Sequence, residues 1–305
     1  MLTYTGSRTH FGDLINDTTS TTLTIGDRLI NHQIKRILGK RNWPFLETTV
    51  PLTTVAGQQF YDLPITCKRA KTLYLTVGGT QYSPVQAPSR EFWDKINSQT
   101  NYTSDIPEFF FPFNGQIGIW PVPATSSNIA TLTCLRTQKD LTISDFSTGT
   151  ILTATPGSAT IIGTGTNWLN AMVGSYFKIT EGLAGVYTDN KGDGRWYEIE
   201  DVVSGTEITL TKPYNGDAVA TGAAVYTIGQ ASIIPEEYQD VPVIAAAYMY
   251  YKVIKPELDI AKEFKAEYDD RFAEFLSDYG QKTTSPVLDE EDDLDFINPN
   301  LTIRL

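Results

Sequence analysis

The chain has 305 residues, of which 41% are hydrophobic and 20% are charged, so it is long enough for one large domain or two ordinary ones. Its formal net charge of −12 argues against a protein that binds nucleic-acid phosphates over a broad surface, and it is compatible with a protein that DNA slides past. With only two histidines and two distant cysteines, Cys67 and Cys134, we expect neither a zinc site nor a disulfide, but two free buried thiols.

Residues 1–23 are polar and rich in threonine and serine, which predicts a loop or arm with at most a short helix near residues 11–15. Thr22 or Thr24 is suited to cap a helix that runs to about Lys40, because apolar residues then recur at helical spacing. Pro44 ends this helix and pushes Trp43 towards an extended conformation. Basic residues fill much of the other helix surface: His32, Lys35, Arg36, Lys40 and Arg41.

Residues 45–137 have the pattern of β-structure with one helical insert. We expect strands at residues 48–53 and 59–63 to form a hairpin around Ala56-Gly57, and a second hairpin to turn at Gly78-Gly79. Pro88-Ser89 is typical of a helix start. Further strands are predicted at residues 109–111, 116–120 and 129–135.

Residues 147–230 hold short β-type runs separated by turn residues, with almost no helical periodicity. This predicts a small all-β domain, a sandwich or a barrel, inserted into the first domain. Helical periodicity returns after Gln230, is interrupted at Lys255-Pro256, and ends near Gly280. Because Val241–Tyr251 is short and contains Pro242, we do not expect a membrane span there. We also expect no signal peptide, because the first residues lack its positive charge and apolar run.

The expected fold class is therefore α+β: a helical bundle with a β layer, an inserted all-β domain, and an extended tail. The corresponding ranges are 1–146 with 231–280, 147–230, and 281–305. The tail combines an acidic run with apolar residues in a segment too small to build a core, so these apolar side chains are expected to find a partner surface. They are Leu294, Phe296, Ile297, Leu301, Ile303 and Leu305.

Signatures of catalysis and of cofactor binding are lacking, so we expect no enzyme, no cofactor and no metal. The loop that contains Asp189 and Asp193 offers oxygen ligands but lacks the closing glutamate of an EF-hand, so a solvated turn is favoured over a cation site. Glu181, Glu198 and Glu200 are interpreted as surface acids rather than as a glycosidase pair. The basic face around Lys35 and Arg36 is expected to meet an acidic neighbouring subunit or to remain solvated, rather than to contact DNA phosphate.

The order of these motifs resembles the head-to-tail adaptor (connector) proteins of tailed bacteriophages, especially those of short-tailed phages. Three segments carry the resemblance: residues 30–46, which contain Trp43-Pro44-Phe45; residues 105–123, which end in Trp120-Pro121-Val122-Pro123; and residues 234–248, which begin Ile234-Pro235-Glu236-Glu237. The inserted β-domain departs from the smaller members of that family and resembles β modules of other phage structural proteins.

The resemblance implies a structural virion protein at the head–tail junction, made in the cytoplasm of the host bacterium. It implies a ring of about twelve copies under the portal, an extended channel through which DNA passes without specific binding, and docking of a tail nozzle or other tail protein. The tail residues given above would bind the portal. Subunit-interface residues are then predicted to be Lys35, Arg36, Trp43, Tyr248, Tyr251, Phe264 and Phe272.

Two other hypotheses remain open. A receptor- or carbohydrate-binding tail protein would use the inserted β-domain for recognition, and a hydrolase would use the glutamates named above. The two long helical segments argue against the first, and the lack of an associated aromatic sugar platform argues against the second.

Overall fold

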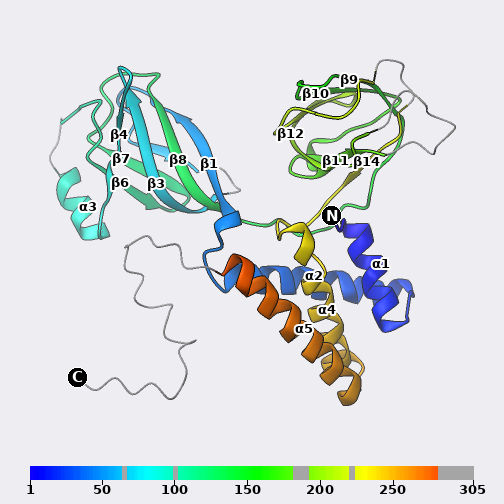
Figure 1. Ribbon diagram of the computed structural model, residues 1–305. Coiled ribbons are helices and arrows are strands. Elements are labelled where there is room, and N and C mark those ends of the chain that lie inside the picture. Colours follow the sequence, from blue (N-terminus) through cyan, green and yellow to red (C-terminus); the bar gives the residue numbers. More distant parts are fainter. Residues whose placement is uncertain (64–66, 99–101, 181–191, 220–223, 281–305) are drawn as a thin grey trace, which may run out of the picture. The chain divides into compact units, whose positions relative to one another are not determined.

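A computed structural model describes residues 1–63, 67–98, 102–180, 192–219 and 224–280. These residues fold as two compact units, with Met1–Gly39 and Asp140–Gly280 in the first and Lys40–Lys139 in the second. Both helices and β-sheets are present (Figure 1), which confirms the predicted α+β class. The predicted domain boundaries near residues 146 and 230 stay a prediction.

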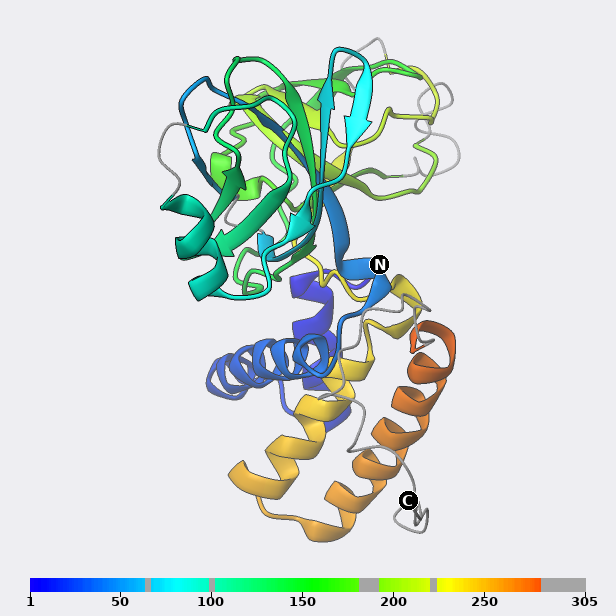
Figure 2. The same cartoon turned by 90° about the vertical axis from the view of Figure 1, so that its left-hand side faces the viewer.

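The first unit contains four helices that pack together: α1 (Tyr4–Ile15), α2 (Ser20–Gly39), α4 (Val241–Met249) and α5 (Leu258–Tyr279). A π-helical turn, η4 (Tyr250–Ile254), follows α4, and a 3₁₀ turn, η3 (Glu236–Tyr238), precedes it. Helix α4 contacts α1, α2 and α5, and it lies between α2 and α5 in Figure 2. Its first seven residues are all buried, as expected of a helix that is apolar on every side.

The prediction of a loop or arm for residues 1–23 is wrong, because α1 is a twelve-residue helix. Thr3 caps it by accepting a hydrogen bond from the Gly6 backbone N–H at 3.2 Å, and Asn16 ends it in the left-handed conformation with φ 51°. Phe11 is fully buried and lies edge-on to Tyr250 at 5.9 Å between ring centroids. Tertiary burial of this one face therefore overrides the poor helix propensity of its Thr, Gly and Ser residues.

Gly26 marks the close approach of α1 to α2, since a Cβ built there would lie 2.4 Å from a ring carbon of Phe11. Intrinsic propensity favours Ala over Gly in a helix by about 1 kcal/mol, but overpacking costs about 1–3 kcal/mol. We expect Gly26→Ala to destabilise the protein, because the buried Phe11 ring cannot move aside. Gly39→Ala in the same helix is the matched control, because nothing lies within 4 Å of its Cβ position. Thermal unfolding followed by circular dichroism compares the two variants, and equal melting temperatures would contradict the close approach.

The second unit consists of two four-stranded sheets. The first has the order β1-β8-β3-β4, and the second has the order β2-β7-β6-β5. One hydrophobic cluster includes Leu73 and Leu132 from the first sheet and Phe110 and Ile117 from the second, so the two sheets share a core. The strands are β1 (Glu47–Thr53), β2 (Phe60–Asp62), β3 (Cys67–Val77), β4 (Thr80–Tyr82), β5 (Val85–Gln86), β6 (Phe109–Phe113), β7 (Gln116–Trp120) and β8 (Ile129–Arg136).

The two predicted hairpins have different outcomes. The turn at Gly78-Gly79 joins β3 to β4 as expected, and both glycines have positive φ. The hairpin around Ala56-Gly57 is wrong, because β1 pairs with β8 while β2 pairs with β7 in the other sheet. The connecting segment instead hydrogen-bonds to residues 123–128: Thr54 N–H donates to Asn128 and Gly57 N–H donates to Pro123, each at 2.9 Å.

Helix α3 (Arg90–Asn97) covers part of the second sheet, and Ser89 caps it through the Phe92 N–H at 3.1 Å, as the sequence indicates. Trp93 on this helix is fully buried, within the same hydrophobic cluster as Trp120. The 3₁₀ turn η1 (Pro44–Leu46) lies between α2 and β1, and Trp43 before it is extended, as predicted from Pro44.

The remaining strands form a six-stranded antiparallel sheet in the first unit, with the order β14-β11-β12-β13-β10-β9. Its hydrophobic core is separate from those of the second unit, and Tyr226, Phe177 and Trp168 lie in it. The short β-type runs predicted within residues 147–230 are strands in the structure. The elements are β9 (Thr150–Ala154), β10 (Thr160–Thr164), η2 (Asn170–Met172), β11 (Tyr176–Ile179), β12 (Tyr197–Ser204), β13 (Glu207–Leu210) and β14 (Tyr226–Gly229).

Candidate interface on the helices

Aromatic side chains on the inner face of α5 form much of its contact with the rest of the first unit. Phe264 stacks on Tyr251 with ring centroids 5.8 Å apart, and the Tyr251 hydroxyl donates to the Ile15 carbonyl at 3.2 Å. Phe272 stacks on Tyr268 at 5.5 Å and packs against the fully buried Phe275. Two of the predicted interface residues, Tyr251 and Phe272, are therefore buried inside their own subunit.

The other predicted interface residues differ in exposure. Trp43 is fully buried in the second unit, where it stacks on Phe45 at 5.7 Å. Lys35 and Arg36 are exposed, whereas Tyr248 and Phe264 are partly exposed. Lys35 pairs with Asp140 at 2.6 Å, and the Tyr248 hydroxyl accepts a hydrogen bond from Lys252 at 2.9 Å. These four side chains thus offer surface to a partner, while the interface role of all seven stays a prediction.

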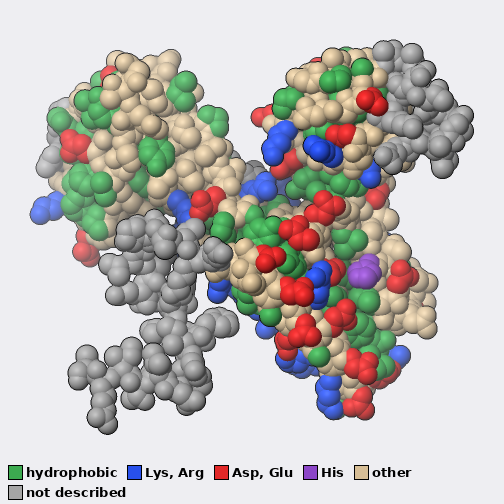
Figure 3. All heavy atoms as spheres, in the orientation of Figure 1, with side chains coloured by type: hydrophobic (Ala, Val, Ile, Leu, Met, Phe, Trp, Pro, Cys, Tyr) green, Lys and Arg blue, Asp and Glu red, His purple; other side chains and the backbone are tan. Residues whose placement is uncertain are grey.

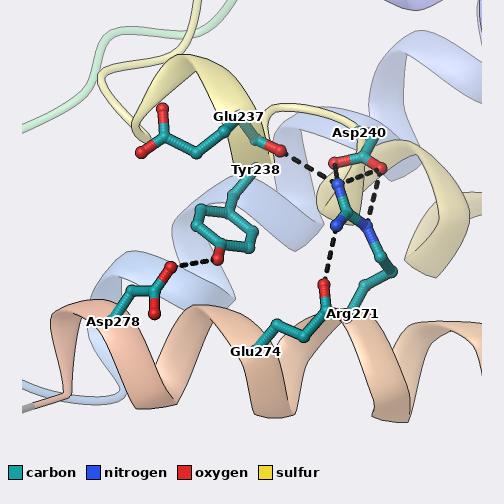
Figure 4. A network of polar contacts seen from close by, with 6 residues as sticks. All are labelled: Glu237, Tyr238, Asp240, Arg271, Glu274 and Asp278. Atoms are coloured by element: carbon teal, nitrogen blue, oxygen red, sulfur yellow. Dashed lines mark hydrogen bonds and ion pairs between the residues drawn. The ribbon is translucent and has the colours of Figure 1, made fainter.

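A polar network joins η3 and the start of α4 to the C-terminal half of α5 (Figure 4). The Arg271 guanidinium donates to both carboxylate oxygens of Asp240, at 3.0 and 3.2 Å, and to the Glu237 carbonyl at 2.9 Å. It also reaches Glu274, at 2.7 Å. Bidentate geometry makes this the strongest type of Arg–carboxylate pair. Pro235, Glu236 and Glu237 are among the residues that carry the family resemblance, but nothing in the sequence indicated a role for Arg271.

Two tyrosine hydroxyls complete the network. Tyr238 donates to the Asp278 carboxylate, and Tyr279 donates to Glu237 at 2.6 Å. These hydrogen bonds, with some burial, raise the pKa of both Tyr238 and Tyr279 to about 12. Both phenols therefore stay neutral donors at physiological pH. The segment that follows the six-stranded sheet, η3 and the start of α4, is therefore bound to α5 by several hydrogen bonds.

The outward faces of α2 and α5 carry opposite charge. On α2, exposed Arg28, His32 and Lys35 follow one another at helical spacing without an acidic residue between them on that face; we call them the basic stripe. On α5, six exposed carboxylates occupy one face, and Figure 3 shows acidic side chains over this region. We call them the acidic stripe: Asp259, Glu263, Glu267, Asp270, Glu274 and Asp278.

Several predicted sites are not tested by the described residues. Asp189, Glu181 and the six apolar tail residues lie outside them. Glu200 is exposed and Glu198 partly exposed on β12. Within the described ranges, no group of three or more His, Cys, Asp or Glu side chains is placed to hold a metal ion. Both cysteines are free thiols, and burial raises the pKa of Cys67 to about 12.

Comparison with known families gives one match. The family model described as "SU10 adaptor protein" matches residues 2–157, just over half of the 305 residues. The matched region contains α1, α2, the whole second unit and the start of the six-stranded sheet. A search of curated proteins found no match. None of the helices in the described part of the chain is long and apolar enough to cross a membrane.

Proposed function

Because the chain belongs to the SU10 adaptor protein family, whose members are phage head-to-tail adaptors, we propose that it assembles as a ring beneath the portal. The ring extends the DNA channel and docks the next tail component. In this proposal the protein is a structural part of the virion at the head–tail junction, and it performs no catalysis. Its partners are further copies of itself, the portal protein and a tail protein.

The family match is the observation that carries this proposal, and the physical character of the chain supports it. A net charge of −12 keeps a surface from binding DNA phosphate tightly, which suits a channel through which a genome must slide. The helices of the first unit and the two-sheet second unit each have a buried aromatic core, which provides rigid surfaces for a repeated assembly.

Mass photometry of the full chain, alone and mixed with the portal ring encoded by the same genome, tests the proposal. We expect particles whose mass corresponds to about one adaptor copy for each portal subunit, near twelve in total. A trimer that ignores the portal would overturn the ring and would favour a receptor-binding role for the six-stranded sheet.

The apolar tail residues are expected to bind the portal, with the preceding acidic run as a spacer. Deleting residues 294–305 should weaken portal binding by about tenfold or more, because several apolar groups lose their burial at once. The melting temperature should stay unchanged, since every buried core described above lies before residue 281. Surface plasmon resonance on immobilised portal and thermal unfolding measure the two effects.

The matched control keeps the chain length and alters only the charge of the spacer. Replacing Asp289, Asp292 and Asp293 by asparagine should leave most of the portal affinity in place. If the truncated chain binds the portal as well as the intact chain does, the tail has no docking role.

A further inference from the structure

The acidic stripe on α5 lacks partners at its centre. Among the described residues, no ion pair or hydrogen bond involves the side chains of Glu263, Glu267 or Asp270. The other three members are engaged: Asp259 pairs with Lys262, Glu274 pairs with Arg271, and Asp278 accepts a hydrogen bond from Tyr238. Like charges three or four residues apart on a helix repel one another, so the three free carboxylates destabilise α5 until a cation approaches them.

The basic stripe on α2 has the complementary character. Arg28 has no ion pair or hydrogen bond among the described residues, and Lys35 pairs only with Asp140. That pair is about half exposed on both sides (57% and 47%), so it contributes little and leaves Lys35 available to a second carboxylate. Both helices are long, with 20 residues in α2 and 22 in α5.

Among the described residues, no ion pair joins the two stripes within one subunit. Helix α4 packs against both α2 and α5 and lies between them, so their solvent faces point away from the shared core (Figure 2). Head-to-tail contact between identical copies requires two complementary surfaces on different sides of the subunit. Repeating this contact forms a closed ring when the rotation from one copy to the next divides evenly into a full turn.

We propose that the basic stripe of one copy packs against the acidic stripe of the next copy in the ring, an inference that rests on the ring proposed above. The charge spacing matches: Arg28 and Lys35 are seven residues apart, as are Glu263 and Asp270, which is about 10 Å along each helix. Two helices that lie side by side therefore bring both pairs of charges together in one register. The partner of this surface is a second copy of the same chain.

Charge reversal tests the pairing in the full chain, with and without the portal ring. The basic-stripe variant carries Arg28→Glu and Lys35→Glu, and the acidic-stripe variant carries Glu263→Lys and Asp270→Lys. Each variant alone should lose self-association by about tenfold or more, because like charges then face one another across the contact. An equimolar mixture of the two should assemble again with alternating copies, and so should one chain that carries all four changes.

The control variant, Glu200→Lys with Asp201→Lys on β12, makes the same change in net charge as the acidic-stripe variant, at exposed positions outside both stripes, and should assemble normally. Circular dichroism establishes whether each variant is folded. If the basic-stripe variant is not folded, a variant with Arg28→Gln and Lys35→Gln takes its place. Native mass spectrometry identifies the alternating composition of the mixture.

The outcomes separate this inference from the proposed function. If the unaltered chain forms no ring alone or on the portal, the function and the pairing both fall. If it forms a ring and the reversal variants do so equally well, the function stands and the stripe pairing is overturned. Folded single variants that fail to assemble, and that neither the mixture nor the four-change chain rescues, also overturn the pairing.

Discussion

Replacing Phe275 with alanine should lower the free energy of unfolding by about 3–5 kcal/mol, the usual cost of truncating a buried phenylalanine. Phe275 is fully buried, and its ring contacts Tyr238 at 5.2 Å, Tyr279 at 5.8 Å and Phe272 at 6.0 Å between centroids. The cavity would open beside the polar network that fastens η3 to α5. Urea unfolding followed by far-UV circular dichroism measures the loss.

Phe264→Ala provides the matched control on the same helix. Phe264 is partly exposed and stacks on one ring, that of Tyr251. Its truncation should cost clearly less, about 1–2 kcal/mol, because less area returns to water and the site can relax. Equal losses for the two variants would mean that the inner face of α5 does not pack around Phe275 as described.

The periodicity of α5 is the clearest case in which sequence predicted structure. Apolar and aromatic residues at steps of three and four placed Phe272 and Phe275 on one face, and both are buried. Lys255-Pro256 correctly marked the break before this helix, and Gly280 its end. A helical periodicity of apolar residues this long is compatible with few structures in water other than an amphipathic helix.

Helix α1 and the false hairpin show what local pattern cannot supply. The helix is held by contacts far away in sequence: Phe11 packs on Tyr250, and the Ile15 carbonyl accepts from Tyr251. The segment around Gly57 has a good turn sequence, yet its backbone bonds to residues 123–128 instead. In both cases tertiary contacts outweigh local propensity, and one sequence does not reveal which distant segments meet.

The candidate interface was predicted by residue type, which does not distinguish a core residue from an interface residue. Large aromatic residues are enriched both in cores and in interfaces, so sequence could not separate buried Trp43 and Tyr251 from the partly exposed Tyr248. The basic face was visible in the sequence. The acidic stripe of α5 became meaningful only when the structure placed α4 between the two helices.

The second large effect is expected in the core of the six-stranded sheet, at Tyr226. This side chain is fully buried, stacks on Phe177 at 5.8 Å, and meets Trp168 edge-on at 5.7 Å. Its hydroxyl accepts from the Trp168 indole N–H at 3.0 Å and donates to the Thr148 carbonyl at 2.5 Å. Tyr226→Ala should cost about 3–5 kcal/mol through the cavity alone, and more through the two polar groups left unpaired.

Tyr226→Phe isolates the hydroxyl, because it keeps the ring and removes only the two hydrogen bonds. It should cost about 1–3 kcal/mol at neutral pH, less than the alanine variant. Intrinsic tryptophan fluorescence during urea unfolding follows this region through Trp168. A phenylalanine variant as unstable as the alanine variant would show that the ring itself contributes little.

Alkaline pH gives the same hydroxyl a distinct signature. Burial raises the pKa of Tyr226 to about 12, against about 10 in the unfolded chain. Between these values the unfolded state has lost the proton that the folded state keeps, so stability falls as pH rises from 10 towards 12, by about 1.4 kcal/mol per pH unit for one proton. Other tyrosines with raised pKa, such as Tyr238 and Tyr279, add to this slope equally in the unaltered protein and in Tyr226→Phe. The unfolding free energy, measured from pH 9 to 12, should therefore fall less steeply with pH in Tyr226→Phe than in the unaltered protein. The two slopes should differ by up to the contribution of one proton, about 1.4 kcal/mol per pH unit. Identical slopes would mean that the Tyr226 hydroxyl is already open to solvent in the folded protein.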